Sequence, residues 1–260
     1  MNWWQAVVLG LVQGLTEFLP VSSSGHLVLA ERLARAQTPG VFVEVALHVA
    51  TLGSVLVVYG RRILELARGL VSGEGAHRGY VWLLVLATIP AALVGALLND
   101  AIEAAFDSLA AVGTAFLLTG VILWSTRRRA GTREAPSTRA ALGIGLMQAL
   151  AILPGVSRSG STVSAALWSG LTAARAAEFS FLMAVPNIAG AAVLEAKDAV
   201  ANVGAVGVGP LGLACVVAFA SGIWAIRLLV ALLRRGRFHA FAPYCWVVGL
   251  FTLLLAWRGT

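Results

Sequence analysis

Runs of apolar residues long enough to cross a lipid bilayer recur along this chain. A membrane-spanning helix needs roughly 20 such residues. In lipid every backbone polar group needs a partner within the protein, which a helix provides. The sequence therefore predicts an all-α, polytopic integral membrane protein with about six full spans, near 41–60, 80–98, 107–126, 178–196, 208–233 and 241–257.

The charged residues are few and lie beside the apolar runs. Only 12% of the residues are charged and 59% are hydrophobic, whereas about 25% are charged in soluble domains. The net charge of +7 comes from arginines that cluster in 61–62, 127–129 and 234–237. Arginines at the ends of spans are typical of cytoplasmic loops. We therefore expect membrane lipids, and no nucleic acid, as partners.

Two further apolar runs, 3–30 and 140–170, are interrupted by proline, glycine and serine. The first contains GLVQ at 10–13 and then LPVSSSG, and the second contains GLMQ at 145–148 and then LPGVSRSG. This similarity predicts an internal repeat of about half the chain.

We expect one membrane domain, 1–260, made of two repeat halves. The halves are approximately 1–126 and 140–260, and the basic segment 127–139 is predicted to be a cytoplasmic linker. Three predicted spans separate the interrupted runs, and an odd number of crossings reverses the orientation. The chain is therefore predicted to be an inverted-topology repeat with two re-entrant helical hairpins, whose interrupted helices meet near the midplane and form the binding site.

The first break carries polar groups that a lipid-facing helix does not need. Gln13 and Glu17 are four residues apart and share one helix face. Pro20 should end that helix at about the preceding residue. Residues 22–25, Ser-Ser-Ser-Gly, are typical of a turn and a new helix start, where free backbone N–H groups bind anions. His26 follows within one helical turn of Ser22 and Ser23, so either hydroxyl is within reach of its ring.

The second break supplies a positive charge. Arg158 lies among hydroxyl residues and glycines and can hold phosphate oxygens in a bidentate manner. A charge within the membrane is costly, so an opposite charge on the facing hairpin, Glu17, would offset part of the cost. A purely structural ion pair, serines that only pack helices, and a core histidine at His26 are the alternatives. His48, His77 and His239 are interpreted as structural or surface residues.

At these residues the sequence resembles the bacterial undecaprenyl-pyrophosphate phosphatases, the bacitracin-resistance family. The matching motifs are Gln13 to His26, QGLTEFLPVSSSGH, and Pro154 to Thr162, PGVSRSGST, and the segments 42–44 and 181–190 are also similar. The resemblance implies hydrolysis of undecaprenyl pyrophosphate to undecaprenyl phosphate and inorganic phosphate, which recycles the lipid carrier for cell-wall polymers. It also implies a bacterial cytoplasmic-membrane location with an active site open to the outer face.

The resemblance also suggests roles for the residues of both breaks. We expect Ser23 to attack the terminal phosphorus with His26 as general base, and Glu17 and Gln13 to hold Mg²⁺ or Ca²⁺. Many family members have glutamate in place of this Gln13, which weakens its case as a metal ligand. Arg158 is expected to hold the pyrophosphate. The expected substrate-binding set is Ser22, Ser24, Ser157, Ser159, Thr162 and Gly155.

Three alternatives stay open. Spacing does not decide between Ser22 and Ser23, and only the resemblance favours Ser23. His26 itself is a candidate nucleophile. A secondary carrier or flippase for an anionic isoprenoid lipid is the alternative function, because inverted repeats with broken helices are typical of transporters. A homodimer is a further hypothesis that the sequence does not test.

Overall fold

The structure is a computed structural model that describes residues 1–34, 40–129 and 131–259. For residues 31–34, 40–42, 44, 99 and 191–206 the structure describes the backbone alone. The predicted family segment 42–44 therefore lies largely outside the described side chains.

In the described part of the chain the regular elements are helices, apart from one isolated bridge between Arg133 and Leu171. The first half contains α1 (Trp3–Phe18), α2 (Ser23–Ala34), α3 (Gly40–Val58), α4 (Gly60–Ser72), α5 (Gly75–Leu97), α6 (Asn99–Asp107) and α7 (Leu109–Trp124). The second half contains α8 (Thr138–Leu150), α9 (Arg158–Trp168), α10 (Ala173–Val206), α11 (Val208–Arg234), η1 (Phe238–Phe241) and α12 (Ala242–Trp257). These elements confirm the all-α prediction.

Several helices have the length and composition of membrane spans. Among the described residues, α5, α11 and the stretch Phe238–Trp257 qualify as unbroken helices. Two bent pairs qualify together, α3 with α4 at 77° and α6 with α7 at 94°. Large apolar side chains such as Trp224 and Val247 are exposed on the outside, as expected where lipid is the solvent. The chain is a polytopic membrane protein, and the count of six full spans stays a prediction.

Two segments between predicted spans are helical. The segment 61–79, between the predicted spans 41–60 and 80–98, forms most of α4 and the start of α5. The segment 99–106, between the predicted spans 80–98 and 107–126, lies in α6. Both are short amphipathic stretches next to a span, and charge count alone does not distinguish such a helix from a loop.

Both interrupted runs are broken helices. α1 ends at Phe18, and the N–H of Leu19 still bonds to the carbonyl of Leu15 before Pro20 ends the pattern. α8 ends at Leu150, and α9 starts at Arg158 with Ser157 as its N-cap. The prediction that the first helix stops near Leu19 is confirmed.

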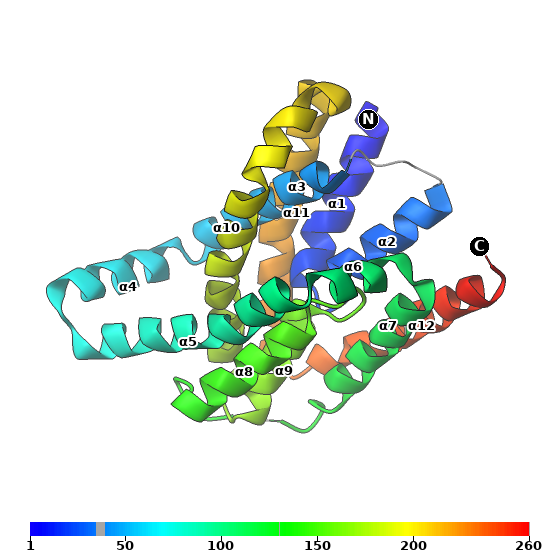
Figure 1. Ribbon diagram of the computed structural model, residues 1–260. Helices are drawn as coiled ribbons and strands as arrows, with labels where there is room; N and C mark the ends of the chain where they lie inside the picture. Colours follow the sequence, from blue (N-terminus) through cyan, green and yellow to red (C-terminus); the bar gives the residue numbers. More distant parts are fainter. Residues whose placement is uncertain (35–39, 130, 260) are drawn as a thin grey trace.

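The two halves use matching contacts. α1 packs along α11, and α8 packs along α5 (Figure 1). Gly10 and Gly145 occupy the same place in the two GLxQ motifs, and each is a close-approach residue. A Cβ on Gly10 would clash with the carbonyl oxygen of Ala214, and one on Gly145 with that of Ala87. This pairing agrees with a repeat, and its inverted topology in the membrane stays a prediction.

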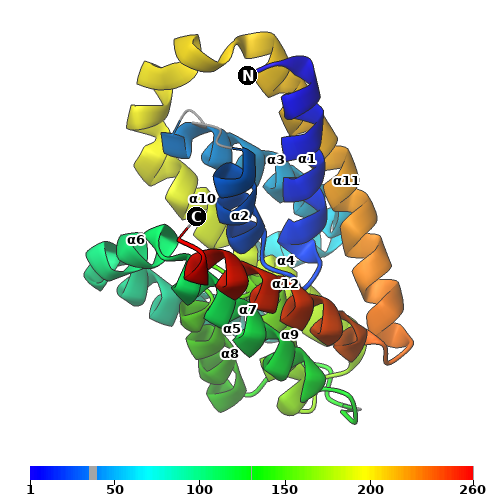
Figure 2. The ribbon, with the colours of Figure 1, turned by 90° about the vertical axis from the view of Figure 1, so that its right-hand side faces the viewer.

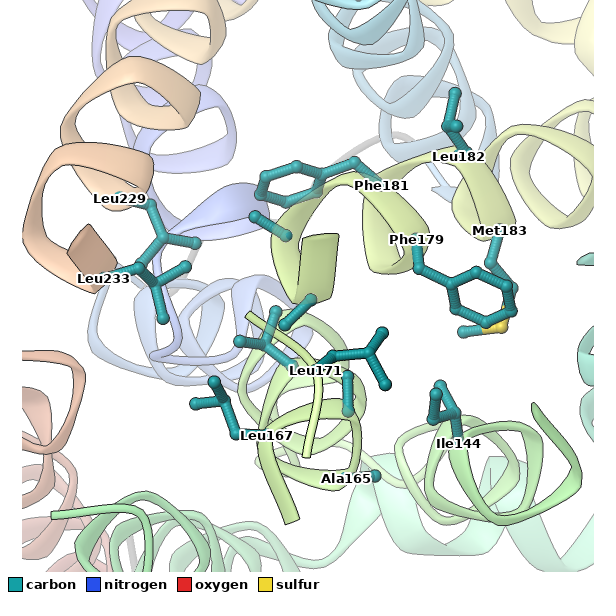
Figure 3. Close-up of a cluster of buried hydrophobic side chains, with 14 of the residues drawn as sticks. Ile144, Ala165, Leu167, Leu171, Phe179, Phe181, Leu182, Met183, Leu229 and Leu233 are labelled. Carbon is teal, nitrogen blue, oxygen red and sulfur yellow. The ribbon is translucent and has the colours of Figure 1, made fainter. Parts of the chain in front are cut away.

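The largest core cluster lies around α10. Figure 3 shows side chains of α8, α9, α10 and α11 meeting there, with Phe179 and Phe181 on α10. Phe18 is fully buried, and its ring meets the ring of Phe181 edge to face at 5.5 Å. Figure 2 shows α7 and α12 side by side below α1 and α2. Because Phe18 directly follows Glu17, this packing holds the polar end of α1 in place.

Candidate active site at the two helix breaks

The two breaks face one cavity of about 660 Å³. Ser23, the first residue of α2, and Arg158, the first residue of α9, both line it. Free N–H groups and the positive end of the dipole make a helix N-terminus attractive to anions. Two such termini and one arginine therefore give the polar part of the cavity a preference for a negatively charged ligand.

Glu17 is the centre of the polar network. Its Oε1 lies 2.8 Å from Nη2 of Arg158. Its Oε2 accepts hydrogen bonds from Ser23 Oγ at 2.7 Å and from Gln13 Nε2 at 3.1 Å. Only 6% of Glu17 is exposed, so these partners supply the stabilisation that water would otherwise give the carboxylate. The predicted pairing of Glu17 with Arg158 is present.

His48 belongs to this network, and its interpretation as an isolated structural or surface residue was wrong. Its Nε2 lies 3.4 Å from Glu17 Oε2, and the residue lines the cavity from α3. The signal that sequence reasoning missed was a lone histidine inside an apolar run, because an ionisable residue in a span is by default a candidate site residue.

The structure separates the roles of Ser22 and Ser23. Ser22 is 2% exposed and has φ +65°, the left-handed region that non-glycine residues rarely adopt. Its Oγ accepts hydrogen bonds from the N–H of Gly25 at 3.3 Å and of Gly155 at 3.1 Å. Ser22 therefore ties the two breaks together, whereas the Ser23 hydroxyl faces the cavity and bonds to Glu17.

His26 differs from the expectation that it contacts the serine hydroxyls. Its Nδ1 lies 2.7 Å from the carbonyl oxygen of Ser22, and its Nε2 lies 2.7 Å from the hydroxyl of Tyr244. The ring stacks on Tyr244 and meets Phe116 edge to face. Both ring nitrogens are therefore engaged away from Ser23 Oγ, because the turn of α2 directs the imidazole toward α7 and α12.

The residues expected to bind substrate fall into two groups. Ser22, Ser24 and Ser157 line the cavity, and substrate binding by them stays a prediction. Ser159 instead donates to the carbonyl of Leu19 at 3.2 Å. Thr162 is fully buried, donates to the carbonyl of Arg158 at 2.7 Å and lies 2.6 Å from the hydroxyl of Ser180. The hydroxyls of Ser159 and Thr162 therefore stabilise the second break through contacts within the protein, outside the cavity lining.

Gly155 forms part of the turn at the second break and does not line the cavity. It has φ +95°, and a Cβ there would clash with the carbonyl oxygen of Val112 on α7. Its carbonyl accepts from Thr119 Oγ1 at 2.9 Å, and the same Oγ1 accepts from the N–H of Ser157 at 3.0 Å. Thr119 therefore fixes the turn that leads into α9, a role that no sequence motif indicated.

Comparisons with known proteins show the family of this chain. Residues 6–251 match a family model described as bacitracin resistance protein BacA. The chain belongs to the BacA family. A relative from Desulfosudis oleivorans is 41% identical over 98% of both chains, and one from Carboxydothermus hydrogenoformans is 39% identical over 100% of this chain and 99% of its own. A relative from Korarchaeum cryptofilum is 36% identical over 96% of this chain and 98% of its own. All three are named undecaprenyl-diphosphatase.

The BacA-family site fits a divalent cation only in part. Among the described residues, no group of three or more His, Cys, Asp or Glu side chains is placed to hold a metal ion. Gln13 is fully buried, and its Oε1 has no hydrogen-bond partner in the described part of the chain. This oxygen and the Glu17 carboxylate are hard ligands that suit Mg²⁺, which commonly takes one or two protein groups together with substrate phosphates.

A second glutamine that lines the cavity was not predicted as a site residue. Gln148 lies on α8, is 2% exposed and lines the cavity. The sequence does contain a signal for it, since Gln148 ends the GLMQ motif that matches the motif ending at Gln13.

Proposed function

We propose that this chain hydrolyses undecaprenyl diphosphate to undecaprenyl phosphate and inorganic phosphate, and so recycles the lipid carrier for cell-wall polymers. Membership of the BacA family and relatives named undecaprenyl-diphosphatase support this proposal. The observation that carries it is the 2.7 Å hydrogen bond from Ser23 Oγ to Glu17 Oε2, beside Arg158 in a membrane protein.

In the first step Ser23 Oγ attacks the terminal phosphorus. A bond forms between Oγ and phosphorus, and the bond from phosphorus to the bridging oxygen breaks, so that the lipid monophosphate leaves. Glu17 accepts the Ser23 proton, because its Oε2 is the acceptor that the hydroxyl already contacts. The two helix N-termini and Arg158 stabilise the charge that develops on the phosphate oxygens.

Arg158 has a donor available for the substrate. Without ligand, its Nη2 is paired with Glu17, and its Nη1 is buried without a hydrogen-bond partner among the described residues. A diphosphate offers the guanidinium a bidentate partner. When Arg158 turns to the phosphate, Glu17 Oε1 loses this partner, while Glu17 Oε2 keeps its contact with Ser23 Oγ.

In the second step water attacks the phosphoserine. Glu17 has passed its proton to the leaving monophosphate or to solvent, and it now accepts a proton from this water. The bond between Ser23 Oγ and phosphorus breaks, Glu17 passes the proton from the water to Ser23 Oγ and so restores the hydroxyl, and inorganic phosphate leaves. The same carboxylate serves as the base in both steps, because both reactions take place at the phosphorus beside Ser23.

The cation belongs to this proposal. Glu17 and Gln13 would hold Mg²⁺ or Ca²⁺ together with phosphate oxygens, and the ion would neutralise charge on the diphosphate. Activity that disappears with EDTA and returns with Mg²⁺ supports this part. Full activity in EDTA contradicts it.

His26 has a different role here from the one that the sequence suggested. Its contacts to the Ser22 carbonyl and to Tyr244 favour a part in holding the start of α2. His26 as general base or nucleophile requires its ring to leave both partners. Glu17 requires no such movement, and we therefore prefer it as the base.

We further propose a bacterial cytoplasmic-membrane location with the cavity open to the outer face, as the resemblance implies, and with the arginine-rich segments on the cytoplasmic side. Cysteine labelling of the linker 127–139 in sealed cells tests this orientation. A homodimer stays a prediction, for which native mass spectrometry in detergent is the measurement.

Phosphate release from farnesyl diphosphate by the detergent-purified protein tests the function. We expect release by the wild type and its loss in Ser23→Ala. A carrier or flippase needs anion donors and a gate but no hydroxyl beside a base. Absence of release in both proteins, with transport of the lipid by both, would support the carrier, which the hydrolase names of the relatives do not favour.

A further inference from the structure

Gln148 presents an unpaired amide to the cavity. The residue is 2% exposed and belongs to the cavity wall. Neither its Nε2 nor its Oε1 has a hydrogen-bond partner in the ranges that the structure describes. Buried polar groups in folded proteins are nearly always paired. A fully buried amide that faces a cavity and has no protein partner is therefore typical of a ligand-binding group.

The comparison with Gln13 explains why this amide is unpaired. Four residues after Gln13 stands Glu17, and Gln13 Nε2 donates to that carboxylate at 3.1 Å. Four residues after Gln148 stands Ile152, which has no acceptor. The two halves thus carry the same glutamine, but only the first half supplies a partner for it. In the second half the acceptor has to come from the cavity.

The position of Gln148 indicates which part of the substrate supplies this acceptor. Glu17 belongs to α1 and Ser23 to α2, so the phosphate that Ser23 attacks lies at the α1 and α2 side of the cavity. Gln148 lies on α8, which packs along α5, and the α5 part of the wall is apolar apart from Thr88, with Ala92 and Gly95 among its residues. The isoprenoid chain begins at the other phosphate and favours the apolar part of the wall.

We propose that Gln148 Nε2 donates a hydrogen bond to the phosphate that carries the isoprenoid chain. This inference rests on the proposed function, because it takes Ser23 as the group beside the terminal phosphate. Substrate and lipid product share the chain-bearing phosphate. Gln148 therefore contributes to the affinity for the diphosphate and for the monophosphate alike, whereas a group on the terminal phosphate contributes to the first alone.

Equilibrium binding of farnesyl monophosphate tests this inference without requiring turnover. Titration calorimetry in detergent compares wild type, Gln148→Leu and the control Thr88→Val. Thr88 also lines the cavity, but its hydroxyl already donates to the carbonyl of Leu84 at 2.9 Å. We expect Gln148→Leu to raise the Kd roughly tenfold to a hundredfold, the range for a hydrogen bond to a charged group. Thr88→Val should stay within about twofold of wild type.

A melting curve of the ligand-free proteins separates binding from structure. Leucine is close to glutamine in size and removes two unpaired polar atoms, so Gln148→Leu should be at least as stable as the wild type. A lower Tm would show that the amide has a structural partner and would overturn the inference. An unchanged Kd for the monophosphate would overturn it as well.

The binding of farnesyl diphosphate in a Ser23→Ala background completes the test. We expect Gln148→Leu to weaken it by the same factor as the monophosphate, and a loss confined to the diphosphate would place Gln148 on the terminal phosphate instead. Failure of the proposed function is seen separately, as a wild type that binds the monophosphate but releases no phosphate from the diphosphate.

Discussion

Removing the charge of Glu17 should abolish most of the activity with only a moderate loss of stability. Glu17→Gln keeps the shape of the side chain but can no longer take the Ser23 proton. A positioned general base contributes about 10²- to 10⁴-fold to the rate. At 1.36 kcal/mol for each factor of ten, this is roughly 2.7–5.4 kcal/mol of transition-state stabilisation. The assay is phosphate release from farnesyl diphosphate, from which kcat and KM are read separately.

Glu178→Gln is the matched control. Glu178 is also a largely buried carboxylate, with 13% of its side chain exposed, and it pairs with Arg62 at 3.1 Å and Arg175 at 3.0 Å. It lies outside the main cavity. Each variant weakens hydrogen bonds to charged groups, worth about 1.5–3 kcal/mol apiece, so both should lower the Tm. Only Glu17→Gln should lower kcat.

Two outcomes would refute this reasoning. A Glu17→Gln variant with kcat within tenfold of the wild type would show that Glu17 is not the base. Equal kcat losses in Glu17→Gln and Glu178→Gln would show that the loss follows stability alone. The kcat values are compared at a temperature well below both melting points, so that both variants are fully folded.

Three further substitutions test the supporting contacts. Ser22→Ala leaves the N–H groups of Gly25 and Gly155 without their acceptor, so it should lower the free energy of unfolding by about 1–3 kcal/mol; an unchanged denaturant midpoint contradicts this. Gly155→Ala combines a strained φ with a clash against α7 and should give little folded protein on size exclusion, whereas a normal yield would show that α7 can move. Tyr244→Phe removes the hydroxyl partner of His26 and should lower kcat less than tenfold; a loss as large as that of Glu17→Gln would restore His26 as the base.

Much of the fold could be predicted from local signals. Apolar runs of span length, and the proline that ends α1, gave helix bounds close to those observed for α1, α7 and α11. The facing charges Glu17 and Arg158 were predictable too, because each is too costly in a membrane without the other. These features depend on composition and on neighbours within one or two helical turns.

Other features depended on where helices pass one another. The ring of His26 was expected to turn toward the serines of its own helix, but stacking on Tyr244, 218 residues away, directs it elsewhere. His48 had no polar neighbour in sequence and reaches Glu17 only because α3 lies against α1. Thr119 is one of many threonines in apolar runs, and only the approach of α7 to the second break makes it the support of Gly155. Spacing along one helix predicts none of these contacts.

The identity of the phosphorylated residue tests the central claim most directly. The protein is incubated with farnesyl diphosphate, quenched in acid for one sample and in base for another, and digested for mass spectrometry. Base preserves phosphohistidine, which acid destroys, so the pair of samples detects either product. We predict phosphate on Ser23 in the wild type and no phosphorylated residue in Ser23→Ala. Phosphate on His26 or Ser22 would contradict the assignment of Ser23 as nucleophile.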